Sequence, residues 1–307
     1  MKSALLLLLG GFTFALLGCG SLVQDVSPDN LPIGTAKLVV HSYISPQDTV
    51  LTVVVETPRA VIGQRPVSYQ YRQPLPNATV DLSEGTRTVR LVYSAKDGLY
   101  RAPIGSLPIV AGRTYTLTVS SPYNYPAITA QCTVPAPVTP TDIRLDSTIN
   151  NQFGQNQRKY ISRLLWKDPA GQANYYRVTG QALRTQRQPV YNSKPPRDTV
   201  ITNVETIYFQ NSSLFSDKSA DGESFISPKA EYSNYNNGPS NGLLQLRVVM
   251  TLNALDENYY RYHEAIDRQN TARDNPFAEP VLIPSNIQNG LGCFGAFNQS
   301  SLSVRVR

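Results

Sequence analysis

Short runs in which apolar and polar residues alternate are the feature that most constrains the fold of this chain. In the run 113–120, Tyr115, Leu117 and Val119 alternate with threonines. A period of two residues is typical of a β-strand that buries one face, because successive side chains point to opposite sides of the sheet. Further runs rich in β-branched and aromatic residues lie at 37–44, 49–56, 77–82, 87–94 and 128–134. The sequence therefore predicts an all-β chain.

Turn residues and prolines divide the predicted strands into two regions. Several strands in about 100 residues favour an immunoglobulin-like or fibronectin-like β-sandwich over 35–138. Pro135, Pro137 and Pro140 interrupt regular structure and mark its end. We expect a second β-rich region over 139–307. Its predicted strands lie near 159–167, 174–183, 199–209, 243–252 and 301–307.

One segment of the second region has helical periodicity. Leu255, Tyr259, Tyr262 and Ile266 are spaced four, three and four residues apart, and charged residues occupy the other side. The pattern predicts an amphipathic helix near 254–269. Its tyrosines can dock onto the sheet, which we favour, or stack against a ligand.

The N-terminus has the pattern of a lipoprotein signal peptide. The apolar stretch Ser3–Leu17 is shorter than a helix that spans a bilayer. It ends at Leu16-Leu17-Gly18-Cys19, which resembles the bacterial lipobox. We expect residues 1–18 to be removed and 19–34 to form a tether, with acyl chains such as palmitate on Cys19 holding the protein on a membrane. The alternative is an ordinary secretory peptide that contains a cysteine.

Composition argues against several classes of protein. Only 16% of the residues are charged, and the net charge of +6 is spread along the chain without a run of Lys or Arg. We therefore expect no nucleic-acid partner. Two histidines leave little material for a general base or a metal centre, so we expect no enzyme activity and no cofactor. Three cysteines are too few for a disulfide scaffold.

A weak calcium motif lies in the second region. Asp217, Ser219, Asp221 and Gly222 match positions 1, 3, 5 and 6 of a calcium-binding loop, where short oxygen-bearing side chains surround a hard cation. Position 12 of such a loop is a glutamate, and here it is Pro228. We favour the alternative, an Asp-rich turn.

A serine hydrolase is a remote alternative. Gly238-Pro239-Ser240-Asn241-Gly242 fits the letters of a nucleophile elbow, which needs a strand before Ser240 and a helix after it. Here the strand-like run 243–250 follows. His263, the only downstream histidine, lies on the predicted helix.

Two cysteines and a set of tyrosines leave alternatives open. A disulfide between Cys132 and Cys293 is permitted outside the cytoplasm, but we favour two separate buried thiols, because the two residues belong to different predicted regions. Tyrosines in loops can recognise a peptide or carbohydrate ligand, or simply cover the loops. They are Tyr69, Tyr71, Tyr123, Tyr125, Tyr232 and Tyr235.

Several motifs resemble a known family. The run 275–297, which follows the Tyr-Tyr-Arg-Tyr helix, is similar to the C-terminal signature of a Bacteroidota outer-membrane lipoprotein family, the domain of unknown function number forty-two forty-nine. Within this run, Gly290, Gly292 and Gly295 predict a tight turn into a closing strand where backbones approach closely. Shorter matches are Lys37-Leu38-Val39-Val40, Asn77-Ala78-Thr79-Val80, Trp166-Lys167-Asp168-Pro169, Tyr175-Tyr176-Arg177 and Phe215-Ser216-Asp217.

The resemblance implies an all-β lipoprotein at the outer membrane, on its periplasmic face or at the cell surface. Members are often encoded near TonB-dependent receptors, which implies an accessory or ligand-capture role beside such a transporter. The family defines no catalytic residue, so only the lipidated Cys19 carries over. A structural or adhesive protein of the cell envelope is the alternative.

Overall fold

The computed structural model describes residues 37–58, 73–152, 155–190, 197–233, 243–272, 279 and 281–306. All of them belong to one compact unit, Lys37–Pro58 and Arg72–Arg307. Most are in strands, and α2 (Glu257–Ala272) is the one α-helix among them. The prediction of an all-β chain with one helix in its second region is therefore confirmed. Cys19, the predicted signal peptide 1–18 and the predicted tether 19–34 lie outside the described residues.

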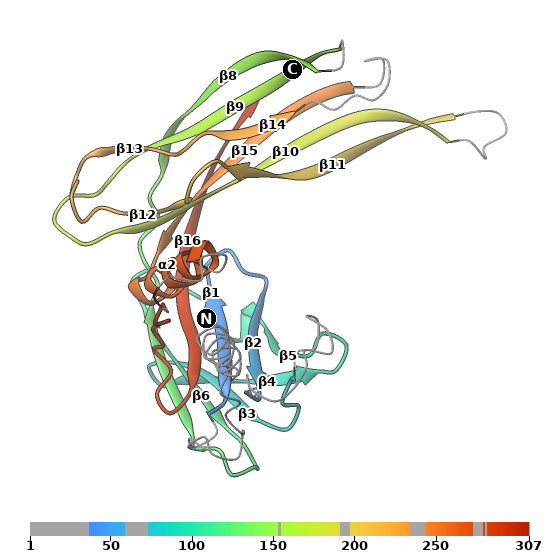
Figure 1. Cartoon of the computed structure of the whole chain (residues 1–307). Coiled ribbons are helices and arrows are strands. Elements are labelled where there is room, and N and C mark those ends of the chain that lie inside the picture. Colours follow the sequence, from blue (N-terminus) through green and yellow to red (C-terminus); the bar gives the residue numbers. More distant parts are fainter. Residues whose placement is uncertain are drawn as a thin grey trace, which may run out of the picture. The chain divides into compact units, whose positions relative to one another are not determined.

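Strands of the N-terminal half surround the first core (Figure 1). They bury alternate residues, and in β6 the side chains of Tyr115, Leu117 and Val119 are at most 1% exposed. The predicted period of two residues is confirmed here, while β5 was not predicted. The strands are β1 (Val39–Ile44), β2 (Val50–Glu56), β3 (Thr79–Glu84), β4 (Arg87–Ser94), β5 (Leu99–Pro103), β6 (Thr114–Ser120) and β7 (Ile128–Thr133).

Strand pairing around the first core follows the order β16-β1-β2-β5-β4-β3-β6-β7. Neighbours along this path pair antiparallel except β1 and β16 (Leu291–Arg305), which run parallel. An isolated bridge between Thr129 and Gln288 brings β7 close to the segment before β16. The immunoglobulin-like or fibronectin-like arrangement of this region stays a prediction.

The first core also contains residues from the end of the chain. Ile287, Phe294 and Ala296 are buried with the N-terminal strands, although they lie within the range 139–307 of the second predicted region. The predicted strand 301–307 is the last part of β16, which begins ten residues earlier, at Leu291. β16 pairs with β1 through its first half and with β15 through its second, so one strand belongs to both regions.

The second core lies between two layers of strands (Figure 1). The Trp166 ring stacks on Phe225, with centroids 5.4 Å apart, and meets Tyr176 and Phe215 edge-on. One layer has β8 (Pro140–Gln152), β9 (Gln155–Lys167), β13 (Ser224–Ile226) and β14 (Ala230–Ser233). The other has β10 (Tyr175–Val190), β11 (Arg197–Phe209), β12 (Leu214–Ser216), β15 (Leu243–Leu255) and β16.

Glycines allow β16 to approach its neighbours closely, as the sequence predicted. Gly292 has a φ of +109°, and a Cβ there would lie 2.1 Å from the carbonyl oxygen of Val40. Gly295 faces the helix, where a Cβ would lie 2.9 Å from the Cβ of Tyr259. Both positions therefore require glycine in order to bring β1 and α2 against β16.

Helix α2 begins three residues later than predicted and is capped by Asp256. The Asp256 carboxylate accepts the backbone N–H of Tyr259 at 2.9 Å and that of Ala296 at 3.2 Å. This carboxylate therefore satisfies a free N–H of the first helical turn and ties the helix to β16.

Candidate functional site

The face of α2 that lies on the sheet carries an aromatic cluster that contains both histidines of the chain. His41 Nε2 and the Tyr262 hydroxyl are hydrogen-bonded at 2.7 Å. From β1, the Tyr43 ring lies 5.0 Å from the Tyr259 ring and 5.3 Å from the His263 ring, measured between centroids. The favoured role of the tyrosine stripe, docking onto the sheet, is confirmed for Tyr259 and Tyr262.

Burial sets the charge of this cluster. It lowers the pKa of His263 to about 4, with help from the positive charge of Arg177, and it raises the pKa of Asp256 to about 6. Desolvation also raises the pKa of Tyr43 far above its ordinary value. Arg177 Nη1 donates to the Tyr259 hydroxyl at 3.0 Å, and the guanidinium lies 5.4 Å from the centroid of that ring. His263 is therefore neutral at pH 7, and the cluster fixes the helix on the sheet.

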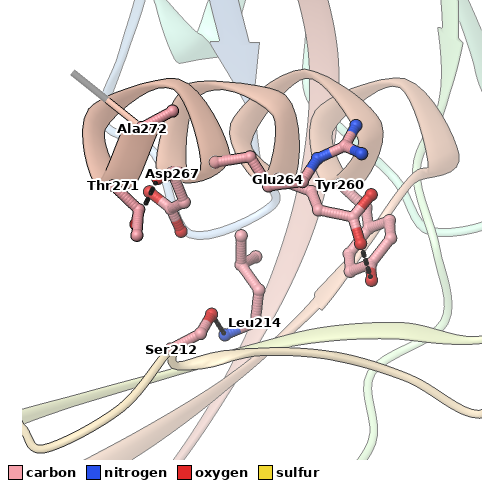
Figure 2. Close-up of a pocket in the computed structure, with 8 residues that line it drawn as sticks. Ser212, Leu214, Tyr260, Glu264, Asp267, Thr271 and Ala272 are labelled. Carbon is pink, nitrogen blue, oxygen red and sulfur yellow. Dashed lines mark hydrogen bonds between the residues drawn. The ribbon is translucent and has the colours of Figure 1, made fainter. Parts of the chain in front are cut away.

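A groove opens between α2 and the segment that contains the start of β12. Its volume is about 590 Å³. Figure 2 shows Leu214 pointing from this segment toward the helix, which supplies most of the groove's polar groups. The lining residues are Ser212, Leu214, Tyr260, Glu264, Asp267, Arg268, Thr271 and Ala272.

Internal contacts hold the side chains of this groove in place (Figure 2). The Tyr260 hydroxyl donates to Glu264 Oε1 at 2.9 Å, and its ring stacks on Tyr175 with centroids 4.7 Å apart. Burial and the negative charge of Glu264 raise the pKa of Tyr260 to about 12, so the hydroxyl keeps its proton at neutral pH. Thr271 Oγ1 donates to the backbone oxygen of Asp267 at 2.9 Å. The groove therefore presents an ordered aromatic ring beside carboxylates.

Three aspartates come together near β9, and two of them belong to the calcium motif. Asp168, Asp217 and Asp221 each place a carboxylate oxygen within 4.8 Å of the others. Ser219, at position 3 of the motif, is exposed. Asp168 was not predicted, because it lies far from the motif along the chain.

Backbone donors already engage these carboxylates. Asp168 accepts the backbone N–H of Gly222 at 2.9 Å and the Tyr176 hydroxyl at 2.5 Å. Asp217 accepts the N–H of Asn174 at 2.8 Å. Asp221 accepts the N–H of Gly171 through both oxygens, at 2.9 and 3.1 Å. These contacts fit carboxylates that hold two loops together, the Asp-rich turn that the sequence favours.

The other predicted site residues that the structure describes do not line the groove. Cys132 and Cys293 are buried, free thiols, and burial raises the pKa of each. Tyr123 is half exposed, whereas the prediction that Tyr232 lies in a loop is wrong, since it is buried on β14 and stacks on Tyr160. Tyr125 packs against the first core. Ser240, Tyr69, Tyr71 and Tyr235 lie outside the described residues.

Sequence reasoning missed the groove. The contact between Tyr260 and Glu264 has the four-residue spacing of helix neighbours, and this spacing could have indicated one wall. Leu214 forms the other wall from a distant strand, and no periodic signal links it to the helix. The helix face that bears the groove could therefore be found from sequence, but its partner could not.

Comparison with known proteins places the chain in a family. The family model described as "Domain of unknown function (DUF4249)" matches residues 23–303, so the chain belongs to this family. No curated protein matches the chain significantly. Within the described residues, no helix combines the length and the apolar composition needed to cross a membrane.

Proposed function

We propose that this chain is a non-enzymatic, lipid-anchored protein of the outer membrane that captures a ligand as an accessory of a TonB-dependent transporter. The lipobox-like sequence that ends at Cys19 supports the anchor. The observation that carries the capture role is the groove of about 590 Å³ between α2 and Leu214.

The groove suits a ligand with both polar and apolar parts. Leu214 and the Tyr260 ring provide apolar area, Glu264 and Asp267 provide hydrogen-bond acceptors, and Arg268 provides donors. Peptides and carbohydrates carry hydroxyl or amide donors beside apolar faces. Because α2 is fixed by its aromatic cluster, the groove is formed before the ligand arrives, which lowers the entropic cost of binding.

Ligand capture is tested by applying the purified chain to an oligosaccharide array and a library of short peptides. We expect retention of members of one class, and loss of retention in Leu214→Asp and Glu264→Gln. The matched control is Leu282→Asp, since Leu282 is 89% exposed and does not line the groove. Equal retention by Leu214→Asp and Leu282→Asp would remove the groove as the site, and no retention of either class would end the capture role.

The transporter partnership is tested by purifying the tagged lipoprotein from detergent-solubilised membranes and identifying the proteins that accompany it. We expect a TonB-dependent receptor to be enriched. A failure to enrich any outer-membrane receptor, across growth conditions, would falsify the partnership.

The anchor is tested by Cys19→Ala. We expect the variant to lose incorporation of labelled palmitate and to leave the membrane fraction. A variant that stays in the membrane fraction would contradict anchoring through Cys19.

A structural or adhesive role is the second candidate, and an exposed face of β11 favours it. Val200, Val204 and Tyr208 on this strand are 58%, 59% and 77% exposed. Apolar side chains at the surface can contact another surface directly. This role predicts that deletion of the gene weakens cell attachment and leaves nutrient uptake unchanged, whereas the accessory role predicts the reverse.

A further inference from the structure

A second cavity lies on the hairpin of β8 and β9, apart from the groove at α2. Its volume is about 320 Å³. Arg144, Arg163 and Lys229 line it together with Asp146, and the side chains of Ile161 and Ile226 provide apolar walls. Three cationic residues against one acidic residue leave the cavity with an excess of positive charge.

The two arginines face each other directly across the hairpin. Arg144 and Arg163 are cross-strand partners in the register of β8 and β9. Like charges at such positions repel each other and weaken the pairing of the strands. Arg163 is half buried, so water screens its charge less than that of an exposed side chain.

The nearby acidic groups offset these cations only in part. Among the described residues, neither arginine nor Lys229 forms an ion pair. The carboxylate of Asp146 accepts the backbone N–H of Ser147 at 2.7 Å. Glu231, on the adjacent strand, forms its ion pair with Lys159, and the positive charge of Lys229 also lowers the pKa of Glu231.

A comparison within the chain separates this cavity from an ordinary pair of surface arginines. Arg247 and Arg305 are also cross-strand partners, on β15 and β16. Both are exposed, so water screens their repulsion. Only Arg163, in the β8–β9 pair, is half buried in a cavity with apolar walls.

We propose that this cavity binds the phosphate or carboxylate group of an amphiphile. The planar guanidinium groups of Arg144 and Arg163 can each donate two hydrogen bonds to such an oxyanion, and Lys229 adds a third positive charge. The apolar part of the ligand contacts Ile161 and Ile226. The source of the oxyanion is either a lipid headgroup or a free amphiphile.

In the binding test, octyl phosphate is titrated calorimetrically into the mature chain, which begins at residue 19 and carries Cys19→Ala. The compact unit of the fold begins later, at Lys37. We expect octyl phosphate to bind more tightly than inorganic phosphate, because only the former contacts the apolar walls. Replacing Arg163 by Gln removes a charge-assisted contact and is expected to weaken binding by about tenfold or more. Absence of octyl phosphate binding overturns the proposal.

The matched control is Arg247→Gln, which removes the same charge from an exposed cross-strand pair. We expect Arg247→Gln to leave the affinity for octyl phosphate unchanged. An equal loss of affinity in both variants would overturn the proposed site, because it would show that net charge alone causes the binding. The melting temperature separates binding from a structural role. Arg163→Gln relieves repulsion, so its melting temperature is expected to stay equal or rise, and a marked fall would assign Arg163 to the fold instead.

Vesicles identify the source of the oxyanion. Phosphatidylcholine vesicles with and without phosphatidic acid are sedimented with the same chain and with Arg163→Gln. Co-sedimentation that requires both phosphatidic acid and Arg163 supports a lipid headgroup. Binding of octyl phosphate without co-sedimentation supports a free amphiphile.

Discussion

The two cores of this protein differ in how far their strands run beyond the buried residues. In β1, intermediate and buried residues alternate along the entire strand. In β11, Ile207 is the one buried residue of the strand, and valines on the other face are exposed. Alternation along β1 therefore records burial, whereas in β11 it continues where no second layer covers the strand. Most of β11 is therefore exposed on both of its faces.

Removing a large side chain from β16 tests whether the two cores unfold together. Phe294 is fully buried in the first core, so Phe294→Ala is expected to lower the free energy of unfolding by about 3–5 kcal/mol. Trp166, the single tryptophan, reports on the second core. Because β16 pairs with both regions, the urea midpoint measured by tryptophan fluorescence and the urea midpoint measured by circular dichroism should shift equally. A fluorescence midpoint that does not move would show that the two cores unfold independently.

A methyl group at Gly292 tests the close approach that joins the last strand to the first core. Gly292→Ala places a Cβ against the Val40 carbonyl at a positive φ, and we expect a loss of about 2–4 kcal/mol in the free energy of unfolding. The control is Gly105→Ala, where a Cβ would meet nothing within 4 Å. Chemical denaturation of both variants measures the difference. Equal stability of the two would contradict a requirement for glycine at this position.

Acidification tests the helix that docks on β16. The pKa of His263 is about 4 in the fold and 6.5 ordinarily, so the fold favours the neutral imidazole and loses stability as the pH falls from 6.5 toward 4. Asp256 acts in the opposite direction: its pKa is raised from 3.8 to about 6, so its contribution is lost as the pH rises through 6. Asp256→Asn keeps an acceptor for the cap and removes this opposing titration.

In the Asp256→Asn variant we expect the free energy of unfolding to fall by about 1–2 kcal/mol as the pH is lowered from 6.5 to 4. This figure allows for solvent screening of the partly exposed His263. Urea midpoints at a series of pH values measure it. Adding His263→Gln to this variant should flatten the dependence within this window. A slope that persists in the double variant would assign the titration to another group.

A polar substitution on the exposed face of β11 gives the smallest expected effect. Val204→Thr on the exposed face of β11 should change the free energy of unfolding by less than about 0.5 kcal/mol. Val178 on β10 is fully buried, so Val178→Thr should cost about 1–3 kcal/mol because its hydroxyl is desolvated. Thermal unfolding of the two variants compares a buried position on β10 with an exposed position on β11. A large effect at Val204 would indicate that another surface covers this face.

Much of the local structure could be predicted from sequence because strand and helix geometry are periodic. The alternation at Tyr115, Leu117 and Val119 matches the buried face of β6. The spacing of Tyr259 and Tyr262 matches the docked face of α2. β5 escaped prediction because a strand of five residues contains too few alternations to stand out.

The candidate sites could be predicted only in part. Asp217 and Asp221 are only four residues apart in the sequence, and a turn brings their carboxylates together, as this spacing suggested. Asp168 joins them from the end of β9 and could not be foreseen. The same limit applies to Leu214 in the groove and to Lys229 beside the two arginines, because each is placed by strand pairing between distant segments.

The sequence by itself determined the β class, the helix and the expected lipid anchor, because these depend on side-chain period or on a short contiguous motif. Only the tertiary structure decided that β16 enters both cores, that α2 forms a groove with Leu214, and that cationic side chains meet on the β8–β9 hairpin. The physical reason is that such contacts depend on which strands pair. Pairing is set by the packing of all strands together, and no local pattern encodes it.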